Sequence, residues 1–276
     1  MTDNKWNHFR KNKKKFIYAM LLLCLLLSTP FAFLLYNEIQ LSQIKPNYIA
    51  HAGGSINGHV YTNSVEAVEH AISCGIKFIE MDLAITSDGK LVCVHDWASF
   101  NEKTIGKSSS DIPTYEEFKE RRFLDGGYRP MTIDDIDSIW SKHQDLYLVT
   151  DKISDPKIID KNLSKFKDRV LIECFKYDDY RTLRTQGYFR PMISGCYNIK
   201  DWLKVVGKSV LDGDICLPTF FCTHNVYFET VQKRHNILAK PTRFGHAVYT
   251  CPNRHSADTL FSKYSNVKLV YVDDIE

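Results

Sequence analysis

The sequence predicts an α/β fold in which parallel strands are joined by crossover helices. From residue 47 onward, short apolar runs typical of strands alternate with amphipathic stretches typical of helices. Several apolar runs end abruptly in His, Glu or Asp, and burying an unpaired charge is costly. Such endings are natural where strand ends converge on a polar site, as at the carboxyl-end face of an α/β barrel.

The first 46 residues differ from the rest of the chain. Residues 16–36 form an uncharged run of 21 residues, and a helix needs about 20 apolar residues to cross a bilayer. Six Lys and Arg residues but one acid precede it, and such flanks stay cytoplasmic. We therefore expect a basic cytoplasmic tail (1–15), a transmembrane anchor (16–36), a linker (37–46) and an extracytoplasmic barrel domain (47–276). A cleaved signal peptide is the alternative, but its apolar region is usually only about 7–15 residues.

Charge and cysteine content exclude some function classes. The net charge is +3, and removing residues 1–15 leaves 30 basic against 32 acidic residues, a net of −2. A body that is not basic gives no reason to expect a nucleic-acid partner. Among the eight cysteines there is no C-x-x-C spacing, so we expect no structural zinc site. The sequence does not show which of the cysteines, if any, form disulfides.

The alternating pattern defines the expected elements. The predicted strands are residues 47–52, 77–84, 91–95, 146–151, 169–175, 190–195, 214–221, 245–250 and 268–273. The predicted helices are the stretch that contains Val65, Val68 and Ile72, then 156–167, 178–187, 199–211, 225–236 and 256–264. Segment 97–145 is the least regular, although Thr114 and Thr132 each read as the cap of a short helix. As a long loop after His95, this segment is expected to cover the site.

Two carboxylates lie two residues apart on a predicted strand. Glu80 and Asp82 therefore point to the same side, and two adjacent carboxylates repel unless a proton or cation lies between them. Asp151 ends another apolar run and is a candidate third ligand. Oxygen ligands favour a hard cation, Mg²⁺ or Ca²⁺. The alternative is an outward-facing acidic pair on a solvated strand.

Two histidines also end strand-like runs. His51 and His95 form a plausible acid and base pair, because histidine titrates near neutral pH; each is alternatively a structural residue. Asn63 and Glu66 are explained as the N-cap and capping-box partner of the first helix. Gly53 allows close approach of a ligand or, equally, a tight turn.

Together these residues resemble a known family, the glycerophosphodiester phosphodiesterases. Its pattern is His-Arg-Gly, Glu-Asn-Thr, Glu-x-Asp, Thr-x-Asp-Gly and Val-x-x-His-Asp. The matching segments are His51-Ala52-Gly53, Thr62-Asn63-Ser64, Glu80-Met81-Asp82, Thr86-Ser87-Asp88-Gly89 and Val92-Cys93-Val94-His95-Asp96. Fainter matches follow at Pro130 to Asp135, Tyr249 to Asn253 and Val272 to Asp274.

The resemblance implies a TIM-type (β/α)8 barrel that hydrolyses phosphodiesters with a divalent cation, Mg²⁺ or Ca²⁺. His51 and His95 would be the general acid and base, and Glu80, Asp82 and Asp151 the metal ligands. A neighbouring glycerol hydroxyl can act as internal nucleophile and give a cyclic phosphate. The expected substrate contacts are Gly53, Asn63, Lys152 and Tyr249.

The sequence departs from the family pattern at three places. Ala52 stands where the family has Arg, which removes a cation expected near the phosphate. Asp151-Lys152 stands where the family has Glu-x-Lys, and strand alternation would turn Lys152 to the other face unless a bulge intervenes. If it does turn away, Lys176, Arg181 or Arg243 would take the role of this lysine. Tyr249 replaces a Trp.

We therefore expect a membrane-anchored phosphodiesterase that acts on deacylated or lyso-phospholipids, a lipid head group, or a glycerol-phosphate polymer of the cell surface. A phospholipase D of the sphingomyelinase D type is the alternative enzyme. The alternative from another class is a non-catalytic descendant of the barrel that binds a phosphorylated ligand.

Overall fold

The chain divides into two compact units, Met1–Ile44 and Lys45–Glu276. The structure, a computed structural model, describes residues 15–18, 20, 21, 24, 39, 44–194, 208, 220–224, 228 and 245–276. No helix within these residues is long and apolar enough to cross a membrane. Most of the predicted anchor, 16–36, lies outside them, so the anchor stays a prediction.

Parallel strands close into a ring in the second unit. The strands of the ring are β1 (Asn47–Ala50), β2 (Phe78–Ile85), β4 (Tyr147–Asp151), β5 (Val170–Cys174), β6 (Arg190–Ser194), β7 (Phe220–His224), β8 (Gly245–Asn253) and β9 (Val267–Asp274). Each pairs in parallel with its neighbour, and β1 pairs with both β2 and β9. Eight parallel strands closed in this way have the architecture of a TIM-type barrel, which confirms the predicted α/β barrel.

One predicted strand lies outside the ring. β3 (Leu91–Cys93) is antiparallel to β2, and the tight turn between them includes Gly89 at φ 79°. The backbone N–H of Gly89 donates to the carbonyl of Thr86. A hairpin partner on β2 therefore explains why the sequence offers one strand more than a barrel needs. Residues 214–219 of the predicted seventh strand lie outside the described part of the chain.

Helices connect most of the strands. The α-helices are α2 (Val65–Ser73), α3 (Trp97–Ile105), α4 (Tyr115–Glu120), α5 (Ile133–Lys142), α6 (Pro156–Leu163), α7 (Tyr177–Thr185) and α10 (Arg254–Lys263). Two 3-10 helices are η1 (His51–Gly53) and η2 (Ser164–Arg169). Of the helices predicted at 199–211 and 225–236, only residues 208 and 228 are described.

The cap of α2 differs from the prediction. Ser64, not Asn63, is the N-cap, because its hydroxyl accepts from the backbone N–H of Ala67 at 3.2 Å. Glu66 accepts from the backbone N–H of Arg129 at 2.9 Å rather than closing a capping box. Two capping residues stand side by side in the sequence, and the helix begins after the second. Asn63 is thereby left available for another contact.

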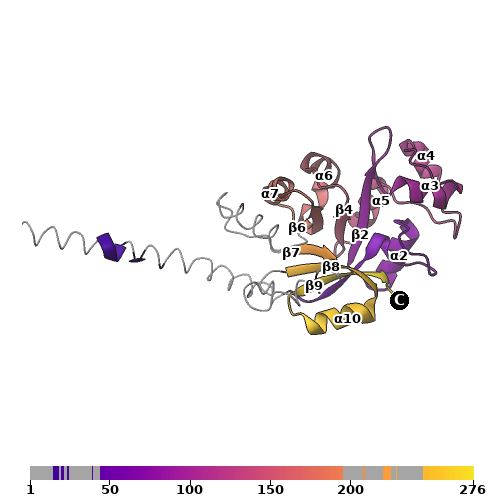
Figure 1. Cartoon of the computed structure of the whole chain (residues 1–276). Helices are drawn as coiled ribbons and strands as arrows, with labels where there is room; N and C mark the ends of the chain where they lie inside the picture. The colour runs from indigo at the N-terminus through magenta and orange to yellow at the C-terminus, as the bar shows by residue number, and fades with distance from the viewer. Residues whose placement is uncertain are drawn as a thin grey trace, which may run out of the picture. The chain divides into compact units, whose positions relative to one another are not determined.

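Segment 97–145 is more regular than expected. It carries α3, α4 and α5, which lie together on one side of the barrel (Figure 1). Thr114 and Thr132 are the N-caps of α4 and α5, as predicted, and each forms a capping box. A buried cluster that includes Phe100, Phe118 and Phe123 joins the segment to the end of β3. The prediction of a loop is therefore wrong, because these aromatic residues give the segment an apolar core of its own.

Candidate active site

Three carboxylates meet at the carboxyl ends of β2 and β4. Asp82 is the direct cross-strand partner of Asp151, and Glu80 lies two residues before Asp82 on the same strand. One oxygen of each carboxylate lies within 4.8 Å of the others. Glu80 and Asp82 are both 1% exposed, so the pair does not face solvent. We call these three residues the acidic trio.

The environment of Glu80 fits a cation. Burial, followed by the charges of Asp82 and Asp151, raises the pKa of Glu80 well above its usual value. Its Oε2 accepts from the backbone N–H of Ala52 at 2.7 Å, but its Oε1 is buried and has no hydrogen-bond partner among the described residues. Buried polar atoms are nearly always partnered. Oxygen donors held this closely are suited to a hard divalent cation such as Mg²⁺ or Ca²⁺.

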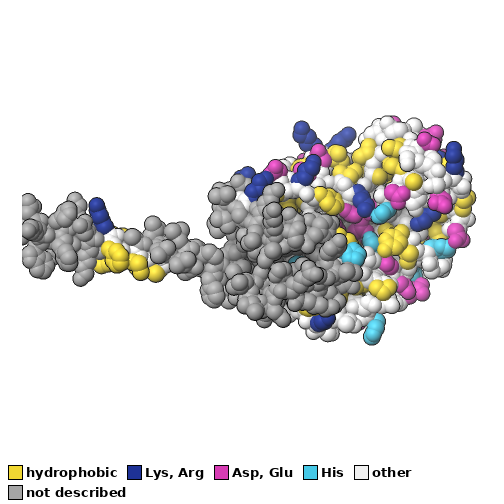
Figure 2. Space-filling view, in the orientation of Figure 1, with side chains coloured by type: hydrophobic (Ala, Val, Ile, Leu, Met, Phe, Trp, Pro, Cys, Tyr) yellow, Lys and Arg dark blue, Asp and Glu magenta, His cyan; other side chains and the backbone are white. Residues whose placement is uncertain are grey.

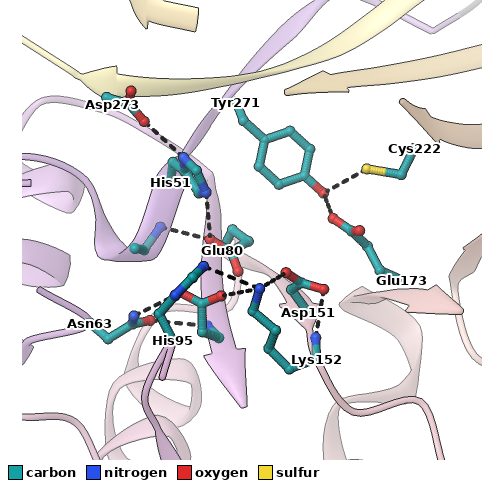
Figure 3. Close-up of polar contacts among 12 residues, drawn as sticks. His51, Asn63, Glu80, His95, Asp151, Lys152, Glu173, Cys222, Tyr271 and Asp273 are labelled. Carbon is teal, nitrogen blue, oxygen red and sulfur yellow. Dashed lines mark hydrogen bonds and ion pairs between the residues drawn. The ribbon is translucent and has the colours of Figure 1, made fainter. Parts of the chain in front are cut away.

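His51 follows β1 directly and faces the acidic trio (Figure 3). Its Nδ1 lies 2.8 Å from Oδ1 of Asp273, and its Nε2 lies 4.0 Å from Oε2 of Glu80. The ring also packs edge-on against Tyr61, whose hydroxyl bonds Asp273 as well. With Nδ1–H donated to Asp273, Nε2 is the nitrogen that is free to exchange a proton. The next residue, Ala52, has a φ of 48°, which brings its N–H to Glu80.

His95 follows β3 and lies on the other side of the trio. Its side chain is 49% exposed, and its Nδ1 lies 3.1 Å from Oδ2 of Asp96. Asp96 also caps α3 by accepting from the backbone N–H of Ser99 at 2.8 Å. This backbone hydrogen bond and His95 lower the pKa of Asp96. The Nε2 atom of His95 lies 3.2 Å from the Nζ atom of Lys152.

Lys152 reaches the site although strand alternation predicts the other face. Its φ of 69° is left-handed, so the chain leaves the strand geometry at this residue. Its Nζ lies 3.2 Å from Oδ2 of Asp151 and 3.8 Å from Oδ1 of Asp82. Burial lowers the pKa of Lys152, but Asp151 and Asp82 outweigh burial, so the pKa is raised overall. Lys152 therefore brings a positive charge to the acidic trio.

The other predicted contact residues, Asn63, Gly53 and Tyr249, make different contacts. Asn63 donates from Nδ2 to Oδ2 of Asp82 at 2.9 Å and accepts the backbone N–H of Asp82 at 3.0 Å. It therefore orients a trio member rather than capping a helix. Gly53, at φ 87°, packs against Ala67 and Val68 of α2, in agreement with a tight turn. Tyr249 lines the same cavity as His51.

Comparisons with known proteins agree with this geometry. The sequence model of the glycerophosphoryl diester phosphodiesterase family matches residues 51–152. A glycerophosphodiester phosphodiesterase of Bacillus altitudinis is 39% identical over 70 residues, 25% of this chain and 27% of the relative. One of Caldanaerobacter subterraneus subsp. tengcongensis is 36% identical over 86 residues, 31% of this chain and 33% of the relative. The matches thus span about a third or less of these curated relatives.

These comparisons support the glycerophosphodiester phosphodiesterase family, with the family model matching residues 51–152 of the 276.

Solved structures of this family share the fold. A glycerophosphodiester phosphodiesterase of Agrobacterium tumefaciens superposes with a TM-score of 0.59 at 17% identity, covering 83% of this chain and 96% of that one. An Oleispira antarctica phosphodiesterase, solved with the product sn-glycerol-3-phosphate, gives a TM-score of 0.60 at 19% identity over 83% of this chain and 93% of that one. The likeness in fold therefore extends well beyond the matched sequence.

Two cavities adjoin the candidate site. The larger, of about 450 Å³, is lined by His51, Glu80, Asp151, Lys152, Glu173, Phe175, Ser194, Tyr249 and Tyr271. The smaller, of about 220 Å³, contains His95 and is walled by residues of α3 and of the segment before α2. In Figure 2, histidine, acidic and basic side chains gather beside hydrophobic ones on the described surface. Segment 97–145 thus forms one wall beside the site.

Asp273 and Glu173 are site residues that the sequence reasoning did not select. Both follow apolar runs, Leu269–Val272 and Val170–Ile172, which is the same signal that identified Asp151. Glu173 is 4% exposed and accepts from the Tyr271 hydroxyl at 2.5 Å. Burial and the charge of Asp151 raise the pKa of Glu173 to about 8.

Proposed function

We propose that the chain hydrolyses phosphodiesters of the glycerophosphodiester type with the help of a divalent cation. The observation that supports this best is the convergence of two histidines on the buried acidic trio. His51 approaches Glu80 from β1, and His95 approaches Lys152 from β3. The product named in the Oleispira antarctica structure, sn-glycerol-3-phosphate, is the kind of product this reaction gives.

We assign His51 as the general base. Asp273 accepts from Nδ1 and stabilises the imidazolium that forms when Nε2 takes a proton from the glycerol hydroxyl next to the phosphate. This hydroxyl then attacks phosphorus and expels the second alcohol, which leaves a cyclic phosphate. Water opens the cyclic phosphate in a second step, in which the same two histidines exchange protons in the opposite direction.

His95 is assigned as the general acid. Its half-exposed ring reaches solvent for proton exchange, and Asp96 supports its charged form through Nδ1. His95 donates a proton to the departing alkoxide, which would otherwise be a poor leaving group. Lys152, which lies 3.2 Å from His95, moves onto the phosphate oxygens and supplies the positive charge that Ala52 cannot.

The acidic trio would hold the divalent cation. When bound, Mg²⁺ or Ca²⁺ neutralises charge that develops on the phosphate oxygens. Asn63 fixes the carboxylate of Asp82 from Nδ2, and the backbone N–H of Ala52 fixes one oxygen of Glu80. The remaining oxygen of Glu80, Oε1, is left without a protein partner among the described residues, as a ligand atom would be.

We also propose the natural setting of the reaction. Residues 1–46 would tether the barrel to a membrane and place it outside the cytoplasm, on the basis of the apolar run at 16–36. A tethered barrel suits deacylated or lyso-phospholipids, or a glycerol-phosphate polymer of the cell surface.

The test is product analysis with the purified full-length chain. Glycerophosphocholine and lysophosphatidylcholine are incubated with Mg²⁺, Ca²⁺ or EDTA, and the products are followed by phosphorus NMR. The proposal predicts metal-dependent release of a glycerol phosphate or its cyclic form, lost in His51→Ala. Release of choline and a cyclic lipid phosphate from lysophosphatidylcholine, without turnover of glycerophosphocholine, would instead identify a phospholipase D of the sphingomyelinase D type. Absence of turnover, with retained phosphate-ester binding, would identify a non-catalytic binding protein.

A further inference from the structure

One of the two candidate histidines lines each of two cavities, and a phosphodiester carries two alcohols. His51 lines the cavity of about 450 Å³, and His95 lines the cavity of about 220 Å³. A phosphate that binds Lys152 and a cation held by the trio would lie beside both histidines, and each cavity would then receive one alcohol. The glycerol must lie on the His51 side, because its hydroxyl gives a proton to that base. This step rests on the proposed function.

The His51 cavity contains a buried acid that the proposed chemistry does not use. In the ring, Ile172 of β5 pairs with Thr150 of β4, so Glu173 lies alongside Asp151, one strand farther from β2. Glu173 is outside the trio that can hold a cation. Its carboxyl is held by the Tyr271 hydroxyl at 2.5 Å (Figure 3). A buried carboxyl costs free energy unless it is partnered, and the Tyr271 hydroxyl is one such partner.

The carboxyl of Glu173 has capacity for one more hydrogen bond. A carboxyl group offers about four acceptor positions, and the described side-chain donors around it are Tyr271, Ser194 and Cys222. A carboxyl can bind a hydroxyl either as hydrogen-bond acceptor or, when protonated, as donor.

We propose that Glu173, positioned by Tyr271, binds the terminal hydroxyl of the glycerol and makes the enzyme selective for glycerol esters. Of the three glycerol oxygens, one bears the phosphate, and the middle one faces His51 as the nucleophile. The third has no partner among the trio and the two histidines. The carboxyl of Glu173 lies in the same cavity as His51, on the far side of Asp151 from β2, where a three-carbon alcohol extends past the metal ligands.

The experiment compares two substrates that differ in one hydroxyl. One is glycerophosphocholine, and the other is its analogue with hydrogen in place of the terminal hydroxyl, which retains the nucleophile. For each protein we measure the ratio of the two kcat/KM values. The wild-type chain should prefer glycerophosphocholine by about 10- to 100-fold, the discrimination expected of one buried hydrogen bond. The ratio is insensitive to the fraction of protein that is folded.

Three variants locate the source of the preference. Glu173→Ala should bring the ratio close to one, chiefly by slowing the glycerol ester, and Tyr271→Phe should lower it because Glu173 is no longer held. Glu173→Gln should retain part of the preference, because an amide still binds a hydroxyl. The control, Glu69→Gln, changes an exposed acid of α2 and should leave the ratio unchanged.

Four outcomes overturn the inference. A wild-type ratio near one shows that the terminal hydroxyl is not recognised, and the proposed function still stands. An undiminished ratio in Glu173→Ala places the recognition elsewhere. Loss of the thermal stabilisation by Mg²⁺ or Ca²⁺ in Glu173→Ala assigns this residue to the metal instead. Turnover of neither substrate by the wild-type chain overturns the proposed function together with this inference.

Discussion

The Nδ1 atom of His51 lies 2.8 Å from Oδ1 of Asp273, although 222 positions separate the two residues in the chain. The closure of the barrel explains this contact. β1 pairs with β9 in parallel, with Ala50 opposite Val272, so the next residues along the two strands, His51 and Asp273, lie side by side. The last strand of the chain therefore completes the site that the first strand begins.

Replacing Asp273 should impair catalysis more than binding. Asp273→Asn removes the charge that stabilises a protonated His51 and allows the wrong tautomer. We expect kcat on glycerophosphocholine to fall by about 100-fold or more with little change in KM. Steady-state kinetics check this, with Asp274→Asn as the matched control at the next position. Equal kcat in Asp273→Asn and wild type would show that His51 needs no orienting carboxylate.

Replacing Glu80 should abolish the response to metal without unfolding the protein. Glu80→Gln replaces a buried carboxyl whose pKa is raised by burial and by its acidic neighbours. Because the neutral amide is not repelled by these neighbours, the EDTA-treated variant should be at least as stable as wild type. Wild-type protein should gain about 2.7 kcal/mol of unfolding free energy at a metal concentration 100 times Kd. Thermal unfolding with and without Mg²⁺ or Ca²⁺ measures this gain. A gain of the same size in Glu80→Gln would exclude Glu80 as a ligand.

Lys152 should act on the phosphate. Lys152→Met removes the cation nearest His95 and Asp151, and we expect kcat/KM to fall by about 10- to 100-fold, the effect of losing one charged contact in the transition state. Lys152→Arg should recover part of this loss. The matched control is Lys157→Met, an exposed lysine at the start of α6. Unchanged kcat/KM in Lys152→Met would show that another cation replaces the missing Arg.

The stability of the metal-free protein should depend on pH through Glu173. Its pKa is raised from 4.5 to about 8 in the folded state, so the folded state binds this proton more tightly than the unfolded state. The unfolding free energy therefore falls as pH rises from about 4.5 to 8 and levels off above that range, a loss on the order of a few kcal/mol.

Urea unfolding in EDTA of wild type and Glu173→Gln isolates this contribution. The difference between the two proteins should decline across the pH range, because glutamine does not titrate. A difference that is constant from pH 5 to 8.5 would show that Glu173 has an ordinary pKa.

Local patterns in the sequence predicted most of the site. Residues that end apolar runs, such as His51, Asp82 and Asp151, meet because parallel strands share a carboxyl end. The same signal was present at Glu173 and Asp273, but single acids after a strand are common at surfaces, and only the closed ring shows that these two face inward.

The start of α2, the direction of Lys152 and the core of segment 97–145 could not be predicted from the sequence. Asn63 and Ser64 are both good capping residues, and packing of α2 decides that the helix starts after Ser64. Strand alternation misplaced Lys152, because a left-handed φ is not encoded by the residue type. The apolar core of segment 97–145 is assembled from aromatic residues of α3, α4 and the stretch that follows α4, so periodicity within either helix was too weak to predict it.

The most direct test of the account is leaving-group dependence in the two histidine variants. His51→Ala and His95→Ala are assayed with glycerophosphocholine and with the nitrophenyl ester of glycerol phosphate, whose leaving group needs no proton. If His95 is the acid, His95→Ala should lose about 100-fold or more on the choline ester and far less on the nitrophenyl ester. His51→Ala should lose equally on both. Equal losses in His95→Ala, or rescue of His51→Ala by the better leaving group, would contradict the assigned roles.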